Sequence, residues 1–174
     1  MVRRGVFVGR FQPFHKGHLQ VILELLKNVD ELIIIIGSSQ KSHELDNPFT
    51  TGERLTMIRE SLRDAGVDDS RYWLIPVPDV DMHTLWVAQV LSYTPKFEVV
   101  YSNEPLTRRL FKEAGLRVES ITFIKRNIFS ATEIRRRMLS GENWEELVPQ
   151  RVAAIINEIG GVERIKELSK KDIV

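Results

Sequence analysis

Short apolar runs alternate with longer amphipathic stretches along most of this 174-residue chain, and this alternation restricts the fold more than any other feature. Five runs are candidate strands: residues 5–9, 31–37, 72–77, 97–101 and 118–123. Strands that are apolar on both faces and separated by helices are typical of a parallel sheet covered on both sides. The pattern therefore predicts an α/β fold, a Rossmann-like doubly wound parallel sheet.

Helical periodicity fills the segments between the runs. Apolar residues recur at helical spacing within 19–29, 55–62, 85–91 and 106–114. The segment Thr50–Glu53 matches a capping box, in which a Thr hydroxyl and a Glu carboxylate each accept a hydrogen bond from a free amide at the helix start. We therefore expect the second helix to begin at this segment.

After about residue 130 the sequence predicts helices only. Ser130–Glu133 matches a second capping box, Asn143–Glu146 opens a short helix, and 149–158 and 162–169 have helical periods. No linker rich in Pro, Gly or Ser separates this region from the rest. We expect one domain overall, with an α/β core over residues 1–129 and a small C-terminal helical subdomain over residues 130–174 packed on the sheet.

The charge balance and the absence of cysteine exclude several functional classes. Lys and Arg number 25 and Asp and Glu number 24, so a net charge of +1 gives no electrostatic reason to expect a nucleic-acid or membrane-surface partner. A chain without cysteine has no disulfide, thiolate nucleophile or zinc-thiolate site. The longest apolar run, Leu32 to Ile36, is far shorter than the roughly 20 residues of a membrane helix. With no signal-peptide profile, we expect a cytoplasmic protein.

The segment Gly9–His18 directly follows the first predicted strand, where sheets of this kind bind their ligands. Free backbone amides and the positive end of the helix dipole converge at the start of the first helix, so we expect an anion there. His15 and His18 are three residues apart on one helical face, so both can donate to one polyphosphate. Arg10 and Lys16 add positive charge. No Gly-x-Gly-x-x-Gly follows this strand, which disfavours a dehydrogenase.

Other interpretations of the two histidines remain open at this point. One histidine near a helix start is more often a cap than a ligand, but two that flank Gly17 after an Arg-containing loop favour phosphate binding. Gly17 also removes a side chain, which lets a nucleotide approach the backbone closely. A metal site would need a third ligand, and the sequence offers none nearby.

A second candidate phosphate site lies at Ser130–Arg135. Hydroxyls and amides at such a helix start bind phosphate, and the Arg135 guanidinium can add a bidentate contact. Taken alone, the segment is better explained as a helix cap followed by a solvated basic run at 135–137. Its occurrence together with the histidine segment favours phosphate binding.

These two segments resemble the HxGH and SxTxxR signatures of the nucleotidyltransferase superfamily. The wider similarity covers almost the whole chain and is greatest to the archaeal-type nicotinamide mononucleotide (NMN) adenylyltransferases. Further matching segments are 37–40, 42–43, 47–50, 52–54, 85–87, 135–138, Trp144, 147–149 and 161–164. The chain departs from the family pattern at His83 and Glu104.

The resemblance implies transfer of AMP from ATP to NMN, which gives NAD and pyrophosphate by direct in-line displacement in NAD biosynthesis. Mg²⁺ is expected on the ATP phosphates, with no metal ligand from the protein, and the assembly is expected to be a homo-oligomer, a hexamer. The expected catalytic residues are Arg10, His15, His18 and Arg135. ATP and its phosphates would be bound by Gly9, Phe11, Lys16, Gly17, Asn103, Ser130 and Thr132. NMN would be bound by Ser38, Ser39, Asp79 and Trp86.

The residues alone leave several alternatives. Trp86 has the spacing of a core residue as well as the aromatic face to stack on nicotinamide, and Asp79 could be a loop cap. Another phosphorylated acceptor, such as phosphopantetheine or flavin mononucleotide, would use the same fold. A regulatory nucleotide-binding module would also keep the phosphate site. The sequence does not distinguish NMN from its acid analogue, or show whether the loop 38–49 closes on substrate.

Overall fold

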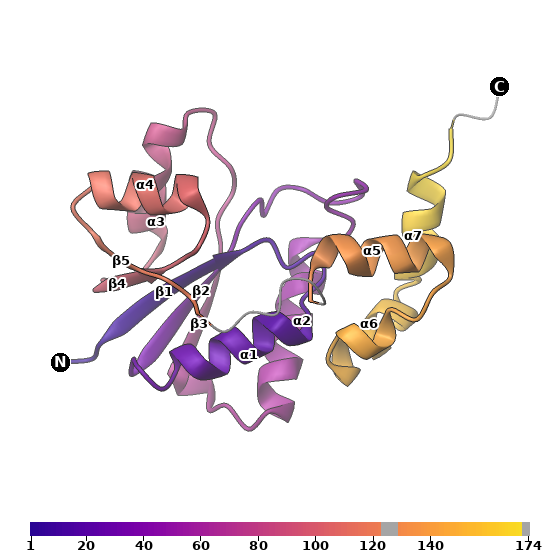
Figure 1. The fold of residues 1–174 in the computed structure, drawn as a ribbon, viewed down its shortest axis with the longest axis horizontal. Coiled ribbons are helices and arrows are strands. Elements are labelled where there is room, and N and C mark those ends of the chain that lie inside the picture. Colours follow the sequence, from indigo (N-terminus) through magenta and orange to yellow (C-terminus); the bar gives the residue numbers. More distant parts are fainter. Residues whose placement is uncertain (123–128, 172–174) are drawn as a thin grey trace. The chain divides into compact units, whose positions relative to one another are not determined.

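The central sheet has five strands, all parallel, in a computed structural model that describes residues 1–122 and 129–171 (Figure 1). The strands are β1 (Arg4–Gly9), β2 (Glu31–Ile36), β3 (Tyr72–Pro76), β4 (Val99–Tyr101) and β5 (Arg117–Glu119). Their order in the sheet is β3-β2-β1-β4-β5, which reverses direction at β1. This is the order of a Rossmann-like doubly wound sheet, so the predicted fold class is confirmed.

Helices connect the strands and continue the chain after the last strand. They are α1 (Lys16–Leu25), α2 (Thr51–Asp64), α3 (Trp86–Tyr93), α4 (Pro105–Glu113), α5 (Ala131–Ser140), α6 (Gln150–Glu158) and α7 (Gly161–Leu168). Short 3-10 turns cover Asp69–Arg71, His83–Leu85 and Glu145–Leu147. No helix among residues 1–122 and 129–171 has the length and apolar character needed to cross a membrane.

Several predicted elements differ from the structure in their bounds; the first helix, for example, ends at Leu25, whereas its predicted period runs to Val29. The strand expected at 97–101 begins only at Val99, and Phe97 precedes it as a buried residue with its ring against Phe111. The strand expected at 118–123 is β5, which ends at Glu119, and residue 123 lies outside the described residues. The short helix expected from Asn143 is a single 3-10 turn.

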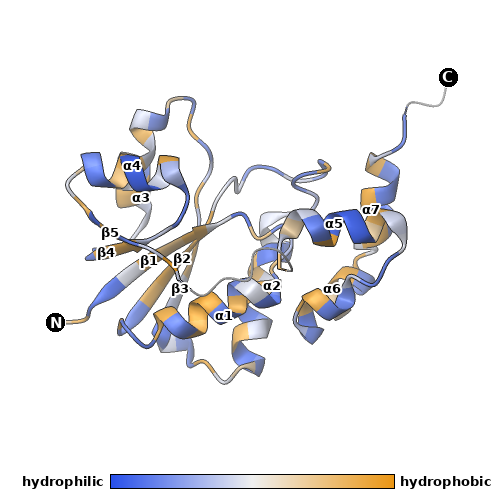
Figure 2. Ribbon diagram, viewed as in Figure 1, coloured by the Kyte–Doolittle hydropathy of each residue, from blue (hydrophilic) through white to orange (hydrophobic). Residues whose placement is uncertain are grey.

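The three central strands, β2, β1 and β4, are buried on both faces, as their composition predicted, whereas the edge strands β3 and β5 are partly exposed. Val6, Ile33 and Val100 belong to a core that includes Val87 of α3 and Phe111 of α4. Residues that alternate with them along the strands are also buried: Phe7, Ile34 and Tyr101. Figure 2 shows the resulting concentration of hydrophobic residues in the sheet.

The chain divides into two compact units, and each is built from separate stretches of sequence. The first unit comprises residues 1–9, 20–39 and 67–124 and contains the sheet. The second comprises residues 10–19, 40–66 and 125–174, so α2 and the segment after β1 belong with the C-terminal helices. The predicted C-terminal subdomain, residues 130–174, did not include these two earlier segments.

The second unit is anchored around the start of α2. The predicted capping box is confirmed: the Thr50 hydroxyl accepts from the Glu53 amide at 3.1 Å, and the Glu53 carboxylate accepts from the Thr50 amide at 2.9 Å. The same carboxylate binds the guanidinium of Arg164 in α7 through two nitrogens, at 2.7 and 2.8 Å. Arg164 also donates to the carbonyl of Pro48. One ion pair therefore fixes α7, the start of α2 and the loop that precedes it.

Candidate active site

The two histidines of the segment after β1 form a stacked pair that caps α1. Their ring centroids are 3.5 Å apart, and the planes differ by 19°. Each Nδ1 accepts a hydrogen bond from the backbone amide of the other residue: His15 N to His18 Nδ1 at 3.2 Å, and His18 N to His15 Nδ1 at 3.2 Å. Because both Nδ1 atoms are acceptors, the proton of each neutral ring resides on Nε2. The pair therefore caps the helix and keeps two Nε2–H donors for a ligand.

Both imidazoles are held in their neutral form. Burial lowers the pKa of His15 to about 4, and burial together with the charge of His15 lowers the pKa of His18 well below its ordinary value. A neutral imidazole still donates one hydrogen bond to an anion without adding a full positive charge. These rings can therefore bind phosphate oxygens at neutral pH as dipolar donors.

Because of this pair, we expect the folded chain to become less stable as the pH is lowered. The unfolded chain binds a proton on His15 near pH 6.5, whereas the folded chain resists it to about pH 4. The stabilisation is complete above pH 6.5 and is lost as the pH falls from 6.5 toward 4, by up to about 3 kcal/mol. Urea unfolding at pH 7.5, 6.0 and 5.0 measures the loss. His15→Asn keeps an acceptor for the His18 amide but cannot titrate, so an equal pH dependence in this variant would contradict the assignment.

Aromatic side chains hold His18 in place. The Phe11 ring meets it edge-on at 4.8 Å between centroids, and the Phe14 ring stacks on it at 5.6 Å. Phe11 is 1% exposed and has a left-handed backbone with φ of 55°, which is rare for a bulky residue. Such conformations persist where the surroundings enforce them, often at functional sites. The Phe11 side chain, expected to bind ATP, thus supports the histidine pair.

Gly17 is required by the packing of the protein itself. A Cβ atom there would lie 2.8 Å from Phe129 Cβ and 2.9 Å from His15 Cε1. Any side chain would therefore force Phe129 or the His15 ring to move from its observed position. Close approach of a nucleotide at Gly17 stays a prediction.

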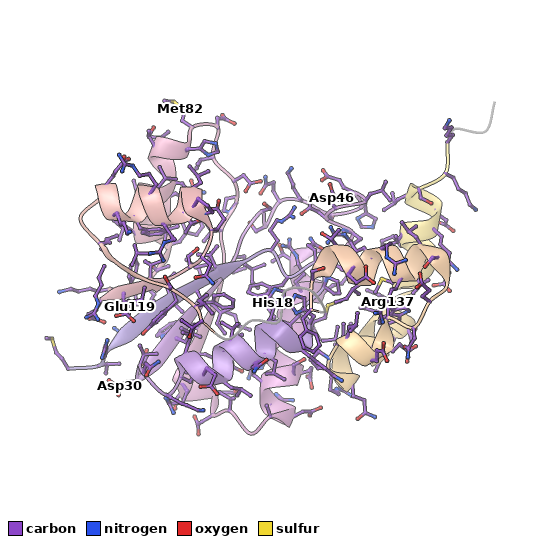
Figure 3. All side chains as sticks on the ribbon, viewed as in Figure 1. His18, Asp30, Asp46, Met82, Glu119 and Arg137 are labelled. Carbon is purple, nitrogen blue, oxygen red and sulfur yellow. The ribbon has the colours of Figure 1, made fainter. Side chains whose placement is uncertain are left out.

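Arg135 joins the two sequence motifs, which lie more than a hundred residues apart. Its side chain comes from the first turn of α5, is buried, and donates to the Gln12 carbonyl at 2.9 Å. The Gln12 amide in turn binds Phe49, whose carbonyl accepts at 3.0 Å and whose amide donates at 2.9 Å. The other Arg135 nitrogen is 3.6 Å from the carboxylate of Asp46. Figure 3 shows Asp46 in its loop and His18 at the start of α1.

Further polar residues of the second unit surround this arrangement. Arg10 donates to the side-chain oxygen of buried Asn47 at 3.3 Å. Burial and the charge of Arg10 lower the pKa of Arg135, while Asp46 opposes this shift. Positive side chains thus gather beside the loop 40–49. Lys16 is exposed at the start of α1.

The start of α5 is capped by only half of the predicted box. The Ser130 hydroxyl accepts from the Glu133 amide at 3.1 Å, and Thr132 lies exposed in the first turn. The Glu133 carboxylate instead binds Arg136 and Arg137, at 2.8 and 3.0 Å, so the reciprocal bond to the Ser130 amide was wrongly predicted. Because Arg136 and Arg137 are paired with acids and Arg135 is buried, this segment is not a free basic run.

The expected NMN-binding residues lie in the first unit. Gly9, which was expected to bind ATP, also lies in this unit: it ends β1, and its carbonyl accepts from the Gly37 amide at 2.9 Å. Ser38 follows β2 and donates to the Asp79 carboxylate at 2.9 Å, and the Ser39 amide donates to Val77. Ser38, Ser39 and Asp79 are therefore neighbours beyond β2 and β3.

Trp86 and Asn103 have structural contacts in the same unit. The half-buried Trp86 ring lies edge-on to Phe111 at 5.3 Å between centroids, so it serves the core while part of its surface is exposed. The side-chain amide of Asn103 donates to the Ile121 carbonyl and accepts from the Ile121 amide. These two bonds use part of the hydrogen-bonding capacity of Asn103 that was expected to serve ATP. Glu104 caps α4 by accepting from the amides of Leu106 and Thr107, which explains a carboxylate at this departure from the family pattern.

Sequence reasoning missed four polar residues of the second unit: Gln12, Asp46, Asn47 and Arg54. Gln12 lies within the histidine segment, and Asn47 and Arg54 lie within the matching segments 47–50 and 52–54, but their contacts are made across separate segments, so the motifs gave them no role. One signal was present for Arg54, which precedes Ile58 by four residues and thus lies on the apolar, buried face of α2.

Comparison with known proteins assigns the family. The cytidylyltransferase-like family matches residues 6–137. The nicotinamide-nucleotide adenylyltransferase of Saccharolobus solfataricus is 52% identical over 97% of this chain and 98% of its own length. That of Archaeoglobus fulgidus is 51% identical over 97% and 99%.

A crystal structure of a bifunctional NMN adenylyltransferase/ADP ribose pyrophosphatase from Francisella tularensis, complexed with AMP and a manganese ion, superposes with a TM-score of 0.77 at 25% identity. The match covers 96% of this chain but only 52% of the bifunctional protein, so the chain spans about half of its length. The chain belongs to the cytidylyltransferase-like family and, within it, to the nicotinamide-nucleotide adenylyltransferases.

Proposed function

We propose that the chain transfers the adenylyl group of ATP to NMN and forms NAD and pyrophosphate. The observation that carries the proposal is the meeting of two phosphate-binding motifs in one unit, where Arg135 binds the carbonyl of Gln12 in the histidine segment. The near-full-length similarity to nicotinamide-nucleotide adenylyltransferases supports the choice of substrates.

The reaction needs no nucleophile from the protein. A phosphate oxygen of NMN attacks the α-phosphorus of ATP, the bond from this phosphorus to the bridging oxygen breaks, and pyrophosphate leaves with the electron pair. The protein must hold two anions in line and stabilise the charge that grows on the leaving group. Preorganised donors that meet this charge lower the barrier.

The residues of the second unit suit this task. The Nε2–H groups of His15 and His18 would donate to the phosphate chain, and Arg10 and Arg135 would bind the developing pyrophosphate. The Ser130 hydroxyl and Thr132 lie at the start of the helix that carries Arg135, where phosphate oxygens are also favoured. On the acceptor side, Ser38, Ser39, Asp79 and Trp86 would bind NMN.

Mg²⁺ would enter the site on the phosphates of ATP. Among the described residues no group of three or more His, Asp and Glu side chains could hold a metal ion. The side chains gathered near Arg135 are mainly cationic or neutral donors, which fit phosphate oxygens rather than a cation. When bound, Mg²⁺ supplies neutralisation of charge on the departing pyrophosphate.

The assembly and the location belong to the same proposal. Similarity to the archaeal-type enzymes supports a homohexamer, and the expected location is the cytoplasm. Sedimentation equilibrium of the purified chain tests the assembly, since a monomer at micromolar concentration would contradict it.

The reaction is tested with ATP, Mg²⁺ and a panel of phosphorylated acceptors: NMN, nicotinic acid mononucleotide, phosphopantetheine and flavin mononucleotide. We expect NAD from NMN with one pyrophosphate per NAD, identified by mass. Product formed only from phosphopantetheine or flavin mononucleotide would overturn the assignment of NMN as the acceptor. Binding of ATP without turnover of any acceptor would instead favour a regulatory nucleotide-binding module.

A further inference from the structure

Arg54 is a fully buried arginine in the first turns of α2. Its guanidinium donates to the Arg10 carbonyl at 2.9 Å and, at 3.3 Å each, to the Thr50 carbonyl, the Lys41 carbonyl and the Thr51 hydroxyl. All four of these acceptors are uncharged. Burying a cation is costly and is offset only where its hydrogen bonds are well made. Arginine suits such a position because its donors form a rigid, planar fork.

Two of these acceptors belong to loops that carry or contact the candidate phosphate ligands. Arg10 begins the histidine segment, and its own side chain reaches Asn47. Lys41 lies in the loop 40–49, which also provides Asp46 to Arg135. A single side chain therefore ties the backbone of both loops to α2, immediately behind the charged groups that would meet phosphate.

The charge of Arg54 also acts on this site. Burial and the neighbouring charge of Arg10 lower the pKa of Arg54 to about 10, against an opposing effect of Glu53, which leaves Arg54 protonated at neutral pH. Arg10 likewise contributes to the lowered pKa of Arg135. Cations that repel one another in a poorly solvated region are stabilised when a polyanion binds between them.

We propose that Arg54 is a positioning residue of the phosphate site, which holds the loops 10–15 and 40–49 in their ATP-binding arrangement and adds positive charge behind Arg10. The proposal rests on the proposed function in one respect: the anion is the triphosphate of ATP. Arg54 itself need not touch the nucleotide, since it acts through Arg10 and through the loop 40–49.

The test compares Arg54→Gln, which loses the charge, and Arg54→Lys, which keeps the charge but loses the fork. Arg71 provides the matched control, because its guanidinium also donates to three backbone carbonyls, those of Leu26, Val29 and Asp30, in the other unit. Arg71→Gln and Arg71→Lys thus report the structural cost of the same chemistry. Calorimetric titration with ATP and with pyrophosphate measures binding, and thermal melting measures stability.

We expect Arg54→Gln to weaken binding of ATP and pyrophosphate by about tenfold or more, and Arg54→Lys by a smaller factor. The KM for ATP should rise in parallel, while the KM for NMN changes by less than about twofold if only the phosphate site is disturbed. The Arg71 variants should melt at lower temperature yet bind ATP like the wild type. A folded Arg54→Gln chain with wild-type affinity for ATP would overturn the proposal.

Two further readouts separate the possible failures. If neither Arg54 variant folds, the Nε–H signal of Arg54 in NMR spectra of the wild type decides: we expect it to shift on addition of pyrophosphate, and an unchanged signal overturns the proposal. Binding is measured without turnover. A wild-type chain that binds ATP but transfers nothing would therefore reject the proposed function and leave the result on Arg54 valid.

Discussion

Replacing His18 with asparagine should lower kcat for adenylyl transfer by about 10²–10³-fold and leave the chain folded. The Asn side-chain oxygen can take the place of Nδ1 and accept the backbone amide of His15, as the imidazole does. It cannot reproduce the Nε2–H donor, which lies farther along the side chain. The substitution therefore removes the proposed contact to phosphate while it preserves the cap of α1.

Steady-state kinetics with saturating NMN, together with thermal melting, measures this effect. His18→Ala is the matched variant, since it loses the donor and also the acceptor of the His15 amide. It should show the same loss in kcat and an additional loss of about 1 kcal/mol in stability. A folded His18→Asn variant with wild-type kcat would show that the pair only caps the helix.

The parts of the fold that could be predicted are those set by local patterns. The run from Leu32 to Ile36 is wholly apolar, and it forms the strand beside β1 with both faces buried. The capping box at Thr50 depends on only four consecutive residues, and it forms as predicted. The second box failed in part because Glu133 has two arginines three and four residues ahead, and these compete for its carboxylate.

The candidate site was predictable only as far as its motifs extend. His15, His18 and Arg135 stand in short patterns whose residue types suit phosphate. The grouping of segment 10–19 with 40–66 and the C-terminal helices depends on tertiary contacts, such as the bonds from Gln12 to Phe49. Such contacts join polar residues with large sequence separation, and neither helical nor strand periodicity records them.

The conservative substitution Arg135→Lys should lower kcat by about 10²-fold, although it preserves the charge. A lysine has one ammonium group in place of the planar fork, so it cannot bind the Gln12 carbonyl and a phosphate in the arrangement of the guanidinium. The Gln12 carbonyl is buried with Arg135, and loss of its donor should cost about 1–3 kcal/mol in the free energy of unfolding.

Arg136 provides the control on the same helix. Its guanidinium is half exposed and paired with Glu133 and Glu142, so Arg136→Lys should change stability little and leave kcat unaltered. Activity and urea unfolding of the two variants are measured side by side. Equal kcat values would show that any cation near the start of α5 suffices. A loss of kcat in Arg135→Lys alone would show that the planar fork of Arg135 is needed, because the two variants make the same change at adjacent residues.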